Sequence, residues 1–425
     1  MQRSKYWHRL DNAAKVFPAI SKSNRSNVFR LSMYLKNNIN KDILNEAVNI
    51  VLDRVEVFNI QLKNGLFWNY FAENKNKFVV EEEPSIVCKH FKFSQNNGFL
   101  FKVYYLNNKI TLETFHSLSD GTGSFAFLKS VVYEYLILMG EKINHENLIL
   151  SRKPFSNKEN EDSFDFNYNP KNKQVLKEEK AYHLTGDTFK DNWTIVFKVQ
   201  TNVKDFLTMV KEKYNVTVTQ YLTALIAYGI YDEGINFINN KKPIKMFIPV
   251  NLRPYFNSKS LRNFSLYIKT TYESKKSWTF EEMLEVTKTQ FVDQLEKDKL
   301  NRRINALVSL EKKLLVRFTP LFIKNIVFKI GYQMLGESIN TSSISNLGKI
   351  TLPKEMEKHV IDFDFINTGH GINTAVSSYK DNLNIIFNTN LKDLSVIKTM
   401  IKQLNKDNIK IFVDTNYKGE YDELL

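Results

Sequence analysis

The sequence predicts an α/β fold made of two similar halves that pack against each other. Three observations support this prediction. Strand-like and helix-like patterns alternate along the 425 residues, a polar segment separates two such stretches, and one hairpin–helix pattern occurs in both. Roughly 150 residues per domain would give two or three domains. We expect an N-terminal half at 1–150, a crossover linker at 151–180 and a C-terminal half at 181–425.

The first half alternates helix and strand patterns. Apolar residues at helical spacing predict a helix at 39–55, and residues 124–139 predict a buried helix that ends at Gly140. Four short runs have the composition of strands: 67–71, 78–80, 99–106 and 109–115. The last two form a predicted hairpin that turns at Asn107-Asn108, because Asn tolerates the positive φ of a tight turn.

The linker and the second half follow. Residues 151–180 are rich in charge, Asn and Pro, which indicates a crossover between domains; a long surface loop inside one domain is the alternative. After the linker, the patterns predict strands at 193–200 and 245–250, and helices at 202–214, 217–231 and 281–299.

An approximate internal echo links the two halves. Residues 101–120 and 374–393 both read as hairpins with Asn-rich tips, and each runs into a helix, at 394–404 in the second case. Two copies of one α/β unit would explain the chain length. The second copy lacks the His and the Asp-Gly of the first, so only the first copy would carry chemistry.

Composition excludes several classes of protein. With 43% hydrophobic and 13% aromatic residues, the chain is not disordered. Its one cysteine, Cys88, excludes a disulfide framework and a cysteine-based metal site. The first 20 residues lack the apolar stretch of a signal peptide, and no run of about 20 residues is free of charge. We therefore expect a cytoplasmic protein without a membrane-spanning helix.

The charge balance is basic, with 60 Lys and Arg against 46 Asp and Glu and a net charge of +14. Such a surface attracts nucleic acid, anionic membranes or phosphorylated ligands. The lysines are dispersed, however, and no helix carries a basic face within a recognisable nucleic-acid-binding module. We expect a solvated basic surface and no nucleic-acid partner.

One motif carries candidate chemistry, the segment HSLSDG that runs from His116 to Gly121. A histidine at the end of a strand can act as a general base, because its unperturbed pKa near 6.5 is close to the operating pH. Asp120 fits the start of the next helix, where a carboxylate is favoured, and Gly121 permits a sharp turn. The alternative is a structural histidine that caps a turn.

The motif resembles the H-H-x-x-x-D-G motif of the chloramphenicol acetyltransferase-like acyltransferases, which include the condensation domains of peptide synthetases and the alcohol O-acetyltransferases. Further passages resemble the same superfamily, in the same order along nearly the whole chain: RLDNAA at 9–14, FP at 17–18, PVNLR at 249–253, RNF at 262–264 and SNLG at 345–348. The sequence departs from the motif at Phe115, which stands in place of the first histidine. The D-F-G-W-G motif of the plant branch is absent.

The resemblance implies two chloramphenicol acetyltransferase-like subdomains that form a pseudo-dimer with a central tunnel. His116 would take the proton from an acceptor that attacks an acyl thioester, and Ser345 would stabilise the oxyanion, with Asn346 beside it as a substrate-binding residue. Asp120 would pair with Arg253 and take no part in proton transfer. With Gly121, these two residues form the structural part of the site.

The expected activity is that of an alcohol O-acetyltransferase using acetyl-CoA or another acyl-CoA. Alternatives are an amine acceptor, an acyl carrier protein as donor, or a non-catalytic accessory protein of the same fold. We expect a monomer. No metal is expected, because the other histidines are scattered: His8, His90, His145, His183, His359 and His370.

Residues 312–335 are apolar with interspersed Lys and Arg. This pattern has two interpretations. The segment either makes weak contact with a membrane surface, or it forms a helix pair, broken at Pro320, that packs on the second half or covers the tunnel.

Overall fold

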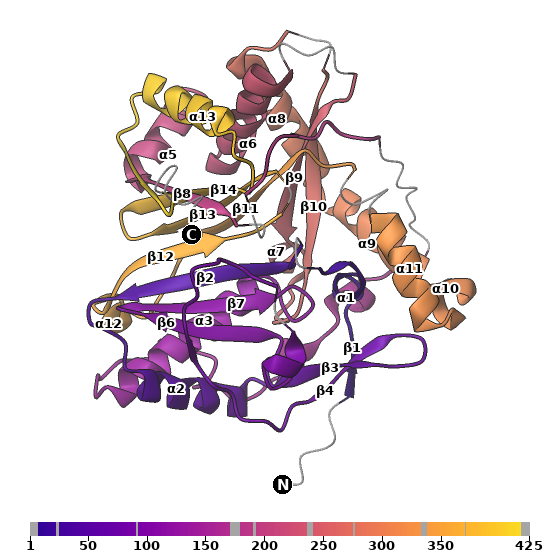
Figure 1. Ribbon diagram of the computed structural model, residues 1–425, viewed down its shortest axis with the longest axis vertical. Coiled ribbons are helices and arrows are strands. Elements are labelled where there is room, and N and C mark those ends of the chain that lie inside the picture. Colours follow the sequence, from indigo (N-terminus) through magenta and orange to yellow (C-terminus); the bar gives the residue numbers. More distant parts are fainter. Residues whose placement is uncertain are drawn as a thin grey trace.

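The computed structural model describes residues 7–22, 25–90, 92–170, 179–189, 193–235, 241–274, 277–332, 338–369 and 371–417. His370, the linker residues 171–178 and the end of the segment 312–335 lie outside these ranges. Figure 1 shows two lobes, each with a β-sheet toward the middle of the molecule and helices on its outer side.

The N-terminal lobe contains a five-stranded sheet and, next to it, a small three-stranded sheet in the order β1-β4-β3. The five-stranded sheet has the order β12-β2-β7-β6-β5. The strands of this lobe are β1 (Trp7–Arg9), β2 (Val28–Leu35), β3 (Ile60–Asn64), β4 (Asn69–Glu73), β5 (Glu81–Glu82), β6 (Phe101–Leu106), β7 (Lys109–Phe115) and β12 (Val360–Ile366).

The C-terminal lobe contains a seven-stranded sheet in the order β10-β9-β11-β13-β14-β8-β15. Its strands are β8 (Ile195–Asn202), β9 (Ile244–Asn251), β10 (Ser265–Tyr272), β11 (Ser342–Lys349), β13 (Ile372–Tyr379), β14 (Asn382–Thr389) and β15 (Ile411–Thr415).

The two sheets repeat one topology over five strands. The N-terminal order β5-β6-β7-β2-β12 corresponds to β11-β13-β14-β8-β15 in the C-terminal lobe. In both series the first pair of neighbours is parallel and the other three pairs are antiparallel. The similarity between the two hairpins therefore extends to five strands of each sheet. This confirms the predicted α/β fold with two similar halves.

The hairpin tips show why the echo is only approximate. The first hairpin turns at Asn107, which has φ 51°, as its Asn-Asn sequence predicts. In the second hairpin the positive φ of 53° falls on Lys380, followed by Asp381, so the asparagine-rich residues that follow belong to the strand β14.

Strand β12 crosses from the second half of the sequence into the first lobe. It pairs with β2 along Val360–Ile366, and Phe363 and Phe365 join the N-terminal core. Lys198 of β8 reaches back to it with an Nζ–Oδ1 distance of 2.8 Å to Asp364. The predicted C-terminal half, 181–425, therefore contributes strand β12 to the sheet of the N-terminal lobe (Figure 1).

Helices cover the outer faces of both sheets. The long ones are α2 (Lys41–Arg54), α3 (Gly121–Leu138), α5 (Val203–Glu212), α6 (Val218–Ile230), α8 (Phe280–Gln294), α9 (Lys297–Lys312), α11 (Leu321–Tyr332) and α13 (Ser395–Lys406). The short ones are α1 (Phe17–Ile20), α4 (Ser163–Phe166), α7 (Arg253–Phe256), α10 (Leu314–Phe318) and α12 (Lys354–Glu357). Local capping explains several starts: Thr217 and Thr279 each form a capping box at α6 and α8.

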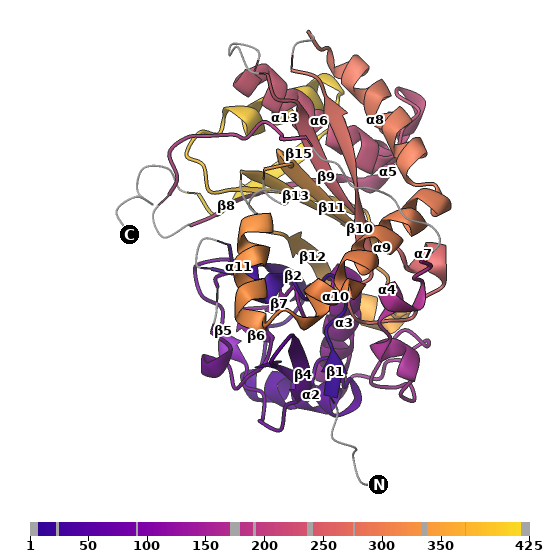
Figure 2. The ribbon, with the colours of Figure 1, turned by 90° about the vertical axis from the view of Figure 1, so that its right-hand side faces the viewer.

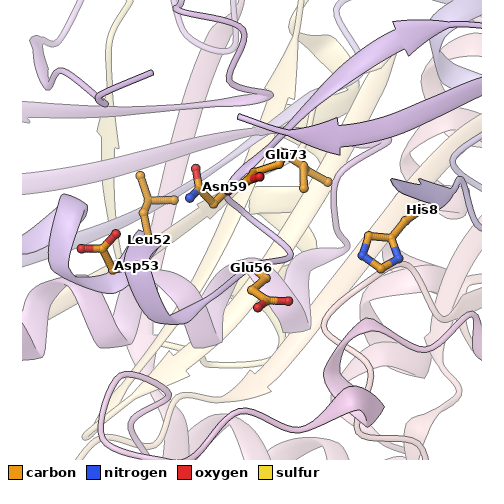
Figure 3. Close-up of a pocket in the computed structure, with 7 residues that line it drawn as sticks. His8, Leu52, Asp53, Glu56, Asn59 and Glu73 are labelled. Atoms are coloured by element: carbon orange, nitrogen blue, oxygen red, sulfur yellow. The ribbon is translucent and has the colours of Figure 1, made fainter. Parts of the chain in front are cut away.

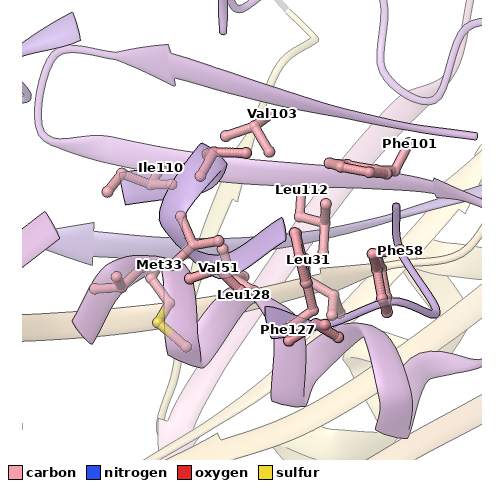
Figure 4. Close-up of a cluster of buried hydrophobic side chains, with 14 of the residues drawn as sticks. Leu31, Met33, Val51, Phe58, Phe101, Val103, Ile110, Leu112, Phe127 and Leu128 are labelled. Carbon is pink, nitrogen blue, oxygen red and sulfur yellow. The ribbon is translucent and has the colours of Figure 1, made fainter. Parts of the chain in front are cut away.

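Each lobe has its own hydrophobic core. In the N-terminal lobe, residues of β2, β6 and β7 pack on α2 and α3, as Leu31, Leu112 and Phe127 illustrate in Figure 4. Helix α3 is buried along most of its length, because it is apolar on nearly all sides. Because α3 is packed in the core, its first residues and the end of β7 before them are held in place.

The structure corrects two of the predicted elements. The helix expected at 281–299 is two helices, because Glu296 is extended between α8 and α9. Gln294 exchanges hydrogen bonds with the backbone of Lys269 in β10, which fixes the end of α8 against that strand. Residues 78–80 are not a strand; Phe78 and Val80 fill the core instead.

The first part of the predicted linker is ordered and joins the lobes. The Glu159 side chain accepts hydrogen bonds from Arg54 of α2, and its carbonyl accepts one from the Leu261 amide. In the described part of the segment 312–335, α10 and α11 form a helix pair broken at Pro320. Helix α10 lies against α9 of the second lobe, and α11 contacts Leu66 and Phe67 of the N-terminal lobe.

Candidate active site

His116 follows directly after the last residue of β7, at the edge where the lobes meet. Its amide donates to the carbonyl of Asn27, just before β2, at 2.9 Å. From the other lobe, the Asn263 side chain donates to the His116 carbonyl at 2.9 Å. Both backbone groups of His116 are therefore fixed, one by each lobe.

Two aromatic rings enclose the imidazole. Phe17 of α1 stacks on it at 4.9 Å between centroids, and Phe29 of β2 lies against it at 4.9 Å with a tilted plane. The Nδ1 atom is buried. Burial lowers the pKa of His116 below its ordinary value, and the Asp120 carboxylate opposes that shift. The ring is therefore mostly neutral at pH 7, as a general base must be.

Asp120 forms the centre of a hydrogen-bond network between the lobes. It is the N-cap of α3 and accepts from the Gly123 amide at 3.1 Å. Arg253 of α7 binds both of its carboxylate oxygens, at 2.8 and 3.0 Å, and the Phe264 amide donates to it at 2.9 Å. The structure thus brings together Asp120 and Arg253, the pair that the resemblance implies.

Arg253 is itself fully engaged. Its Nε donates to the Ser260 carbonyl at 2.8 Å, and one terminal nitrogen donates to the Arg262 carbonyl at 2.6 Å. With Asp120 and the Asn251 side chain, these partners occupy all five guanidinium donors. A guanidinium held in this way cannot act as an acid or reach a substrate, so its role is structural.

Two glycines at the start of α3, Gly121 of the motif and Gly123, lie close to residues of the other lobe. Gly121 does not have the positive φ that a sharp turn would need; instead, a Cβ there would lie 2.8 Å from Leu347 Cδ2 of the other lobe. The predicted reason for Gly121 is therefore wrong. Gly123 is more constrained, because a Cβ would lie 2.1 Å from the Leu261 carbonyl oxygen.

Ser345 lies on β11 and is connected to the strand ends beside His116. Its Oγ accepts from Asn367, directly after β12, at 3.3 Å. The next residue, Thr368, donates to the Val28 carbonyl at 3.0 Å, and Val28 pairs with Phe115. Ser345 is thus tied by two hydrogen bonds to the edge that carries His116.

Asn346 is not part of this cluster. Its side chain donates to Thr219 of α6 at 2.9 Å and accepts from the Gly348 amide at 2.7 Å. Successive strand residues point to opposite faces, so Asn346 points away from the face that carries Ser345. Its role in substrate binding stays a prediction.

The position of the missing first histidine is part of the core. Phe115 is buried and lies 5.0 Å from the ring of Phe93. The Phe115 ring packs on Phe93, whereas the His116 ring packs on Phe17 and Phe29. The two side chains therefore have different ring partners, and the departure from the motif at Phe115 does not alter the rings that enclose His116.

The opening RLDNAA segment has a structural role at the lobe interface. Asp11 is fully buried, accepts from the Ala14 amide at 2.8 Å and lies 3.6 Å from the Nε of Arg262. Burial raises the pKa of Asp11 to about 6, while Arg262 opposes the shift. The segment thereby positions α1 and its ring on His116.

Other polar sites lie apart from this one. The pocket in Figure 3 is lined by residues of the N-terminal lobe such as His8, Glu56 and Glu73, and does not include His116. Within the described ranges, no group of three His, Cys, Asp or Glu side chains could hold a metal ion. The central tunnel stays a prediction.

Sequence reasoning did not assign roles to Phe17, Phe29, Asn263 and Gly123. Phe17 and Asn263 belong to passages that carry the resemblance, but their contacts with His116 depend on chain folding. The only local indication of a role for Gly123 was that it follows Gly121 by two residues, in the run DGTG at 120–123.

The chain is similar in structure to acyltransferases and condensation domains. Trichothecene 15-O-acetyltransferase of Fusarium sporotrichioides superposes with a TM-score of 0.59 at 11% identity, over 93% of this chain and 95% of that one. TRI101 of F. sporotrichioides, solved with coenzyme A and T-2, gives 0.60 at 11% identity, over 96% and 99%.

The starter condensation domain of rhizomide synthetase, solved with C8-CoA and Leu-SNAC, gives a TM-score of 0.60 at 10% identity, over 94% of this chain and 93% of that one. No family model matches the sequence. No curated protein matches it either. At these identities the superpositions establish the shared fold.

Proposed function

We propose, from the fold that it shares with these acetyltransferases and condensation domains, that the chain is an acyl-CoA-dependent acyltransferase acting on an alcohol hydroxyl. The observation that carries the proposal is the position of His116, whose backbone is fixed by both lobes, beside the buried Asp120–Arg253 pair. The coenzyme A complexes of two structural neighbours support the donor class.

His116 acts as the general base. Since Nδ1 is buried, Nε2 is the nitrogen left to take the proton of the acceptor hydroxyl. The acceptor oxygen then bonds to the thioester carbonyl carbon, and the Ser345 hydroxyl donates to the oxygen that becomes negative, an interaction commonly worth several kcal/mol. When the carbon–sulfur bond breaks, the leaving thiolate takes the proton from His116, which returns to its neutral form.

The remaining site residues maintain this geometry. Asp120 is bound to Arg253 through both carboxylate oxygens, so it moves no proton. Phe17 and Phe29 enclose the imidazole and keep water from it, which favours its neutral form. The site requires only side chains for the proton transfer, and the donor supplies the activated acyl group.

The test is release of free thiol from acetyl-CoA in the presence of short, long and aromatic alcohols and of amines. Wild type, His116→Ala and the control His145→Ala, a partly exposed histidine in the loop after α3, are compared after circular dichroism shows that all three are folded. We expect acceptor-dependent release that falls by about two orders of magnitude or more only in His116→Ala.

Each other outcome has a distinct meaning. Release only with amines would make the chain an N-acyltransferase. Activity only with an acyl group on a carrier protein would favour the donor type implied by the condensation-domain likeness. Wild type that is inactive with every donor, or His116→Ala with wild-type activity, would refute the proposal and favour a non-catalytic accessory protein.

A further inference from the structure

Helices α10 and α11 present an apolar face to solvent. Leu315 is 87% exposed, Phe322 68%, Val327 58% and Ile326 56%. On α11, residues 322, 326 and 330 follow each other at intervals of four, so they form one continuous stripe along the helix. Figure 2 shows both helices on the outer surface of the molecule, facing the viewer. Soluble monomers rarely expose a contiguous apolar patch of this kind.

The orientation of this face is fixed, because α11 is anchored through its polar side. Lys324 is 3% exposed and donates to the carbonyls of Phe67 and Arg317, at 2.8 and 3.2 Å. Its Nζ also lies 3.5 Å from the centroid of the Trp68 ring. The helix therefore buries a lysine and exposes its apolar residues. Turning the apolar face inward would break these contacts.

The charge of the segment selects the partner. No Asp or Glu occurs between residues 312 and 332, and Lys313, Arg317 and Lys329 are exposed on the same helices. A second copy docking through the same face would bring these cations toward one another, because a two-fold interface pairs a patch with itself. Anionic lipid headgroups would instead attract and neutralise them.

The described part of α11 is short. Helix α11 has 12 residues, and among the described residues no helix has the length and apolar character needed to span a membrane. An apolar face flanked by cations is typical of helices that lie in the plane of the interface.

We propose that the face formed by α10 and α11 docks onto an anionic lipid surface, with Leu315, Phe318, Phe322, Ile326, Val327 and Ile330 inserted among the lipids. The docking is independent of the proposed acyl transfer. It would place the bilayer close to the candidate site, because α11 packs on α1 and Phe17 of α1 stacks on His116. A hydrophobic acceptor dissolved in the lipid would then reach the site from this side.

The test is sedimentation of the full chain with phosphatidylcholine vesicles, with and without phosphatidylglycerol, at low and high salt. The test variant is Phe322→Glu/Val327→Glu. The control is Leu207→Glu/Val292→Glu, which adds the same charge at exposed apolar positions of α5 and α8. We expect wild type and control to bind the anionic vesicles, with binding about tenfold or more weaker in the test variant and in high salt.

Three results would overturn the proposal. Wild type could fail to bind anionic vesicles, the control variant could lose binding as much as the test variant, or binding could be equal on neutral vesicles. Gel filtration tests the alternative that a second copy of the chain covers this face. A dimer that dissociates only in Phe322→Glu/Val327→Glu, in the absence of vesicle binding by wild type, would assign the face to that second copy. None of these readouts depends on acyl transfer. A failure of the docking proposal can therefore be told apart from a failure of the proposed enzymatic function.

Discussion

The substitution Asp120→Asn tests how the site is held together. The carboxylate accepts four hydrogen bonds, from the Gly123 and Phe264 amides and from two nitrogens of Arg253. Each oxygen accepts two of them. In the variant, one oxygen becomes an NH₂ group that faces two donors, so two hydrogen bonds are lost. The buried guanidinium also loses its counter-charge.

The expected cost follows from the burial of the pair. The side chains of Arg253 and Asp120 are only 10% and 6% exposed, so water cannot replace the lost partner. Removing one member of a buried ion pair costs about 3–5 kcal/mol. The control Asp165→Asn removes one member of the pair between Asp165 and Lys312, whose side chains are 59% and 46% exposed. Such an exposed pair contributes about 0–1 kcal/mol.

The measurement is urea-induced unfolding followed by circular dichroism, together with thiol release at several pH values. We expect Asp120→Asn to lower the free energy of unfolding by several kcal/mol more than Asp165→Asn does. Its remaining activity should have a pH midpoint below that of wild type, because His116 remains the base and the variant lacks the Asp120 charge that raises the pKa of His116. A stability within about 1 kcal/mol of wild type would refute the structural role. Wild-type stability with a lowered pH midpoint would instead assign the carboxylate only its electrostatic effect on His116.

Three further predictions concern packing and titration. Gly123→Ala should lower the melting temperature far more than Gly121→Ala, because its Cβ would meet a backbone carbonyl at 2.1 Å rather than a leucine side-chain tip at 2.8 Å; equal losses would contradict this. The acidic limb of kcat/KM should have its midpoint below pH 6.5, because burial lowers the pKa of His116; a midpoint above 6.5 would exclude it as the titrating base. The third concerns Asp11, whose pKa is raised to about 6 from 3.8, so the folded state binds its proton more tightly than the unfolded state. Between pH 4 and pH 8, wild type should therefore lose about 2.4 kcal/mol of unfolding free energy relative to Asp11→Asn, and a difference that does not vary with pH would contradict the shift.

The sequence by itself determined the local elements around the site. The Asn-Asn turn, strand β7 ending at Phe115 and the Asp120 cap of α3 depend on residues that are neighbours in the chain. Patterns of period two and 3.6, and turn residues that tolerate positive φ, act over a few residues. Because each hairpin–helix pattern is encoded by neighbouring residues, its recurrence at 101–120 and 374–393 could be seen in the sequence and indicated two similar halves.

Only the tertiary structure decided what surrounds His116. Strand β12 pairs with β2, although more than half of the chain separates the two strands in sequence. Phe17 and Asn263 contact His116 from segments that are distant in sequence. The need for glycine at 121 comes from Leu347 of the other lobe. The outward apolar face of α11 likewise follows from the burial of Lys324. These features depend on which surfaces pack together, and hydrophobic burial is non-directional, so no local pattern in the sequence encodes them.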